Sequence, residues 1–167
     1  MTYITSGAEK KNGTILLRDE IEKIIKEEQI DRNRFHEFSK SNYGDILKKF
    51  YYSFTDYSRF ATTEITFSRK RLHIRSNLDC FAIAGIYTAD SWMEYINVIK
   101  SALPVKANEK IFLILAVGFV YEGYTDEMFQ VLHKMDEWIG DFFIVSSQFD
   151  GFITHDYIDG CTFMYQK

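Results

Sequence analysis

The stretch DFFIVSSQFDGFITHDYIDGCTFMYQK, residues 141–167, decides the fold class of this chain. It contains three short runs rich in aromatic and β-branched residues, which are typical of strands. Two Asp-Gly dipeptides, at 150–151 and 159–160, separate these runs and are strong signals for hairpin turns. The segment therefore predicts a three-strand antiparallel meander. Its strands are expected near 141–147, 151–157 and 160–166.

Upstream of the meander, the apolar pattern predicts helices and further strands. Apolar residues at helical spacing predict helices near 15–30, 43–50, 91–103 and 126–138. Alternating or continuous apolar runs predict strands at 64–67, 72–75, 81–86 and 110–117. The last run is apolar on both faces, so we expect it at the centre of its sheet. This order predicts an α+β fold, in which a largely antiparallel sheet carries about three to four helices on one side.

Polar residues are expected at the N-termini of three helices, namely Thr14, either Asp90 or Ser91, and Thr125. Glu94 lies three residues after Ser91, which is the spacing of a capping box. The residues before Thr14 are mostly polar and show no periodicity. We therefore expect a flexible N-terminus, 1–13, followed by a single α+β domain over 14–167. A chain of 167 residues is long enough to bury one compact core.

Charge is distributed unevenly along the chain. From Phe119 to Lys167 there are nine acidic residues and two lysines, a formal charge of −7, whereas the preceding residues carry a formal +3. An acidic surface is unsuited to a polyanion and complements a basic protein, because opposite fields accelerate encounter. Aromatic residues, which favour interfaces, make up 17% of the chain. The C-terminal region therefore predicts a site for a basic protein.

No residue pattern in the sequence indicates catalysis, a cofactor or a metal. Neither the four histidines nor the two cysteines have the spacing of a metal site. Ser146 and Ser147 lack a GxSxG elbow around them. His155 is expected to be a packed or surface residue rather than a general base. Because no catalytic pattern is present, we expect a protein that is not an enzyme. The N-terminus has no apolar signal-peptide core, so we expect a cytoplasmic location.

Three segments carry a resemblance to a known family: KIFLIL (110–115), VYEG (120–123) and DFFIVSSQFDGFITHDYIDG (141–160). Together they resemble small bacterial immunity proteins of contact-dependent inhibition and polymorphic-toxin systems, over roughly residues 108–167. The resemblance implies a protein that binds the C-terminal domain of a cognate toxin in the cytoplasm and blocks its active site. Such toxins are often nucleases, so an acidic surface would stand in for phosphate in a basic cleft.

The partner is expected to contact the turns of the meander and a nearby loop. The candidate contact residues are Glu122, Tyr124, Asp150, Asp156, Tyr157 and Asp159. One alternative is a non-catalytic ligand-binding or scaffold module. A second is an RNA-binding protein that uses the basic hairpin 64–75, because basic and aromatic residues together bind single-stranded nucleic acid.

Overall fold

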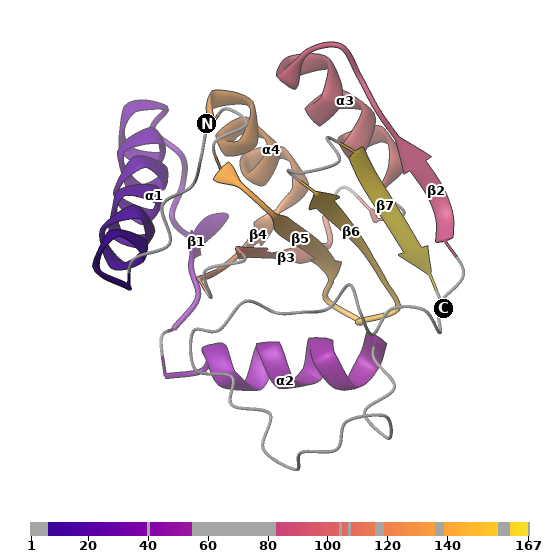
Figure 1. Cartoon of the computed structure of the whole chain (residues 1–167), viewed down its shortest axis with the longest axis horizontal. Helices are drawn as coiled ribbons and strands as arrows, with labels where there is room; N and C mark the ends of the chain where they lie inside the picture. Colours follow the sequence, from indigo (N-terminus) through magenta and orange to yellow (C-terminus); the bar gives the residue numbers. More distant parts are fainter. Residues whose placement is uncertain are drawn as a thin grey trace.

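The structure of the chain is a computed structural model that describes residues 7–39, 41–54, 83–103, 105–106, 108–115, 119–135, 139–156 and 161–166 (Figure 1). The helices within these residues are α1 (Gly7–Glu27), α2 (Tyr43–Phe54), α3 (Trp92–Ala102) and α4 (Thr125–Lys134). The strands are β1 (Phe35–Glu37), β2 (Ile83–Tyr87), β3 (Lys110–Leu115), β4 (Val120–Tyr124), β5 (Phe142–Ser146), β6 (Gly151–Asp156) and β7 (Cys161–Gln166). The predicted basic hairpin 64–75 lies outside the described residues.

The seven strands form one sheet in the order β1-β4-β3-β5-β6-β7-β2, and every neighbouring pair is antiparallel. The predicted α+β class is therefore confirmed, together with the C-terminal meander of β5, β6 and β7. The strand β3 lies between β4 and β5, and its residues 111–115 are all buried. This confirms the central position that its uniformly apolar sequence predicted.

Helices cover both faces of the sheet, so the expectation that they pack on one side is wrong (Figure 1). The helices α1, α3 and α4 pack against one face, where β3 and β5 contribute Leu113 and Ile144. The helix α2 packs against the other face, to which the same strands contribute Phe112 and Val145. Because β3 and β5 supply apolar side chains to two cores, their sequences show no alternation between apolar and polar residues.

The core under α2 consists largely of phenylalanine rings. Phe50 lies 5.4 Å from Phe143 and 5.2 Å from Phe152, measured between ring centroids. Phe54 lies 4.5 Å from Phe152 with the rings edge to face. Such pairs contribute about 0.5–1.5 kcal/mol each beyond the burial of their area. The high phenylalanine content of the chain therefore serves, in this part of the fold, to hold a single helix on the sheet.

Two of the three predicted helix caps are wrong. The helix α1 begins at Gly7, so Thr14 lies inside it, and residues 7–13 are helical in part of the segment expected to be flexible. The helix α4 follows β4 without a loop, and its N-cap is Tyr124, which makes no side-chain capping bond. Thr125 is the first helical residue. The third prediction is confirmed, because the Ser91 hydroxyl accepts a hydrogen bond from the Glu94 amide at 3.3 Å.

The strands β1 and β4 were not predicted from the sequence, and they meet where Phe35 pairs with Gly123. A Cβ atom on Gly123 would lie 2.4 Å from the Arg34 carbonyl oxygen and 2.7 Å from Cδ2 of Phe35. The Tyr124 amide donates to the same Arg34 oxygen at 2.9 Å, so that oxygen is held in place. Only glycine allows the two backbones to approach this closely.

Substituting Gly123→Ala should therefore lower the free energy of unfolding by about 1–3 kcal/mol, because the added methyl group must displace backbone atoms. Urea unfolding followed by circular dichroism measures this loss. The matched control is Gly44→Ala in α2, where an added Cβ meets no atom within 4 Å. Alanine is the better helix former there, so the control should be neutral or more stable by up to about 1 kcal/mol. Equal stability of the two variants would contradict the close approach.

Candidate functional site

The six candidate contact residues do not lie together as the sequence suggested. Glu122 and Tyr124 lie in the strand β4, so their expected position in a loop is wrong. Asp150 lies in the turn before β6, whereas Asp156 is the last residue of that strand. A strand of this length separates its ends by roughly 17–20 Å. Asp150 and Asp156 therefore lie at opposite ends of β6. Tyr157 and Asp159 lie outside the described residues.

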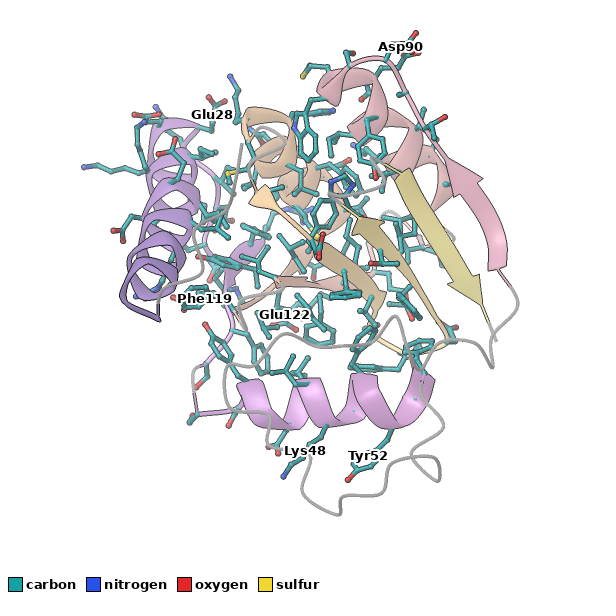
Figure 2. The ribbon with its side chains drawn as sticks, in the orientation of Figure 1. Glu28, Lys48, Tyr52, Asp90, Phe119 and Glu122 are labelled. Carbon is teal, nitrogen blue, oxygen red and sulfur yellow. The ribbon has the colours of Figure 1, made fainter. Side chains whose placement is uncertain are left out.

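Glu122 faces the interior of the molecule on the side of α2 (Figure 2). Its carboxylate lies 3.5 Å from the Lys110 Nζ and 3.6 Å from the His36 Nε2, and its side chain is 17% exposed. Asp150 is exposed, and its carboxylate accepts a hydrogen bond from the Ser146 hydroxyl across the turn. Glu122 is therefore a structural carboxylate, and of these two only Asp150 faces solvent.

Tyr124 already has a cationic partner within the chain. The guanidinium carbon of Arg34 lies 4.3 Å from the centroid of the Tyr124 ring, which is a cation–π contact. Arg34 also donates two hydrogen bonds to the Glu127 carboxylate, one of them at 3.1 Å from Nη2 to Oε2. These bonds raise the pKa of Arg34 above its usual value. The ring is thus occupied on one face before any partner binds.

The charge asymmetry along the sequence is partly cancelled in space. Three acidic residues of the C-terminal region pair with basic residues that precede Phe119. The pairs are Glu127 with Arg34, Glu122 with Lys110, and Asp126 with Lys100. The Asp126 carboxylate lies 2.7 Å from the Lys100 Nζ, and this hydrogen bond lowers the pKa of Asp126. A count of charges along the chain therefore overstates the acidity that this region presents to a partner.

The outer surface of α3 is a more accessible acidic site, and the sequence did not point to it. Met93 is 54% exposed, the largest exposed fraction among the apolar side chains that the structure describes. The exposed residues Asp90 and Glu94 flank it, and Asp90 points away from the sheet (Figure 2). Within the described residues, no cation pairs with either carboxylate. We call Asp90, Met93 and Glu94 the α3 surface.

The α3 surface adjoins a shallow depression of about 500 Å³. The depression is lined by Glu94, Asn97, Val98, Ser101 and Ala102 along one side of α3. The opposite side of the helix is buried and carries Tyr95, Ile96 and Ile99. The sequence did contain a sign of this surface. Met93 lies outside the apolar side of the helix predicted over 91–103, so it is an apolar residue on a solvent-facing side.

His155 packs between α3 and the sheet; of the two positions that the sequence left open, packed or at the surface, its exposed fraction of 4% shows the packed one. Its Nδ1 forms a hydrogen bond with the Tyr95 hydroxyl, and its ring centroid lies 5.8 Å from that of Trp92. Burial lowers the pKa of His155 to about 4, so the ring is neutral at pH 7. Asp156 follows directly, which brings this end of β6 close to the first turn of α3.

Among the residues that the structure describes, no three side chains of histidine, cysteine, aspartate or glutamate cluster closely enough to hold a metal ion. None of the described helices combines the length and the apolar character that crossing a membrane requires.

Removing the charge of Glu122 should lower stability, whereas removing that of Asp150 should not. Glu122→Gln loses its attraction to Lys110 and His36 in a partly buried place, so we expect a loss of about 1 kcal/mol in the free energy of unfolding at pH 7. Asp150→Asn keeps an oxygen for the Ser146 hydroxyl and should change stability by less than about 0.5 kcal/mol. Chemical unfolding of both variants checks this. A larger loss for Asp150→Asn would reverse the assignment.

Comparison with known proteins adds a family and no described activity. No curated protein and no solved structure gave a match to the chain. Residues 14–167 match DUF6756, a family of unknown function, and because the match covers most of the chain, this protein belongs to that family.

Proposed function

We propose that this protein is a non-catalytic binding protein that neutralises a basic partner protein, in the manner of the immunity proteins that its C-terminal third resembles. The partner is the C-terminal domain of a bacterial toxin, of which a nuclease is the best fit, and binding takes place in the cytoplasm. The observation that carries the proposal is the α3 surface, where the exposed Met93 lies between the carboxylates of Asp90 and Glu94, which have no cationic partner among the described residues.

The composition of the α3 surface fits a protein interface. Affinity in interfaces concentrates in an apolar anchor that is surrounded by polar groups, and Met93 with its two flanking carboxylates has this arrangement. Methionine adapts its shape to different partners because its side chain is unbranched and flexible. Carboxylates without an internal cation attract a basic protein more strongly than those already paired, such as Asp126. A basic cleft that normally holds phosphates would therefore be the preferred partner surface.

The proposal changes the set of contact residues. Asp156 remains a candidate because it ends β6 next to His155, which contacts the first turn of α3. Tyr157 and Asp159 remain predictions from the sequence. Glu122 and Tyr124 leave the set, since their side chains already bind cations within the chain. Asp150 lies at the opposite end of β6 and would belong to a separate contact.

If the proposal holds, a large exoprotein with a variable C-terminal domain is encoded next to this chain, and that domain is the partner with which the function is tested. Co-expression of the protein with the C-terminal domain of a neighbouring exoprotein should restore the growth of cells that the domain alone inhibits. The two purified proteins should form a complex of equal stoichiometry, measured by calorimetry. A metabolic gene context without such an exoprotein, or the absence of both rescue and binding with its C-terminal domain, would overturn the proposal.

The contact surface is tested with variants of α3. Met93→Ala should weaken the complex about tenfold, mainly through faster dissociation, because it removes the apolar anchor. The double variant Asp90→Asn with Glu94→Gln should slow association and reduce its dependence on salt. Asp19→Asn, an equally exposed carboxylate on α1, is the matched control and should bind as the wild type does. Wild-type affinity in a variant that combines Asp90→Asn, Met93→Ala and Glu94→Gln would place the interface elsewhere.

A further inference from the structure

The ring of His155, which belongs to β6, packs against α3 and against the neighbouring strand β5. The ring of Phe142 stacks on it with centroids 5.1 Å apart and planes 29° apart. Tyr95 and Trp92 of α3 make edge-to-face contacts with it, with centroid distances of 5.0 and 5.8 Å. Two of the three rings around the imidazole therefore belong to α3, so whatever favours this arrangement also holds α3 in place.

The surroundings of His155 favour the neutral ring over the protonated one. Nδ1 is bonded to the Tyr95 hydroxyl, whereas Nε2 is buried and has no hydrogen-bond partner among the described residues. A protonated imidazole has two N–H donors and a full charge. In the closed site the imidazolium would bury its full charge, together with an Nε2–H donor that has no acceptor among the described residues, and this is costly in an apolar place. The site therefore excludes the proton as long as it stays closed.

The titratable groups that face His155 from the described elements are Tyr95 of α3 and Asp141, which precedes β5. Asp141 is the one charged group whose field favours the imidazolium, and its effect is smaller than that of burial. Burial dominates, which is why the pKa of His155 lies near 4, below the ordinary value of 6.5. When the site opens to water, the ring regains its ordinary affinity for protons.

Of the two elements that enclose His155, α3 is the easier to move. The strand β6, which carries His155, is hydrogen-bonded to β5 and β7 along its length. The described attachment of α3 runs through side chains such as Ile96 and Ile99, together with a 2.8 Å hydrogen bond from the Trp92 Nε1 to the Leu132 carbonyl oxygen. Local opening follows the weaker attachment, so exposure of His155 should proceed by displacement of α3.

We propose that His155 is a proton-operated latch, whose neutral ring holds α3 on the sheet and whose protonation releases α3. The sign follows from the preference of the open state for the proton. As the pH falls from about 6.5 towards 4, the open state binds a proton that the closed state excludes, so opening becomes more favourable. Between pH 7 and pH 5 the ratio of open to closed α3 should rise roughly 20-fold, and below about pH 4 it should level off.

The test is amide hydrogen exchange at pH 7 and pH 5, expressed as protection factors so that intrinsic exchange rates are removed. Protection at Ile96 and Ile99 of α3 should fall roughly 20-fold at the lower pH. Leu113 of the central strand β3 reports global unfolding, which also exposes His155, so its protection should fall by a similar factor but should stay well above that of α3 at both pH values. Equal protection factors at α3 and β3 at both pH values would mean that α3 opens only when the whole domain unfolds, and this outcome would overturn the latch.

Two variants identify the responsible group. His155→Phe keeps an aromatic wedge without a titrating nitrogen, so the extra loss of protection in α3 at pH 5 should disappear. His133→Gln is the matched control, because His133 on α4 contacts α3 through Asn97 at 2.9 Å and is also a partly buried histidine. The control should keep the full loss. Persistence of the loss in His155→Phe, or its disappearance in His133→Gln, would overturn the assignment.

A measurement on the wild type keeps the proposal testable even if His155→Phe does not fold. The Cε1 proton resonance of His155, followed by NMR in the folded protein, should titrate with a midpoint below pH 5. A midpoint near 6.5 would show that the closed site accepts the proton, and the latch would then be ruled out. Neither measurement requires a partner protein, so the latch stands or falls independently of the proposed function.

Discussion

The pairing of β3 with β5 is the interaction on which the rest of the structure depends. These strands lie in the interior of the sheet, with Leu113 opposite Ile144, and both are buried on both faces. Each core exists because the same two strands supply alternate side chains to it. A shift of register by one residue would exchange the side chains of the two cores, which differ in shape: one receives three helices and the other a helix held by phenylalanine rings.

The N-terminal third of the described chain completes this sheet and its electrostatics. The short strand β1 extends the sheet at the side of β4 and requires a residue without a side chain at position 123. The same region provides Arg34 for Glu127, and Arg18 for Glu37 at 2.6 Å. Partly buried acids thus receive cations from distant parts of the sequence. Their charge is used for internal attachment, and this makes exposed carboxylates elsewhere the better indicators of a binding surface.

The two sides of the helix α3 have different surroundings. Its inner side places Tyr95 against a neutral buried histidine, and its outer side presents Met93 and two carboxylates to solvent. Such a helix is suited to a regulated interface, because a change in its attachment to the sheet alters the surface that it presents. The physical basis is the cost of burying a charge, which makes the closed arrangement conditional on the protonation state of one ring.

Local chemistry determined much of this protein from the sequence alone. The Asp-Gly turns, the apolar run at 110–115 and the cap at Ser91 predicted the meander, the central strand and the start of α3, because each depends on neighbouring residues. The tertiary structure alone decided the pairing of β1 with β4, the placement of α2 on the second face and the division of the candidate contact residues. Each of these depends on contacts between residues far apart in the chain. The spacing of residues along a sequence carries no information about which distant cation will neutralise which carboxylate, or which face of a doubly buried strand a helix will cover.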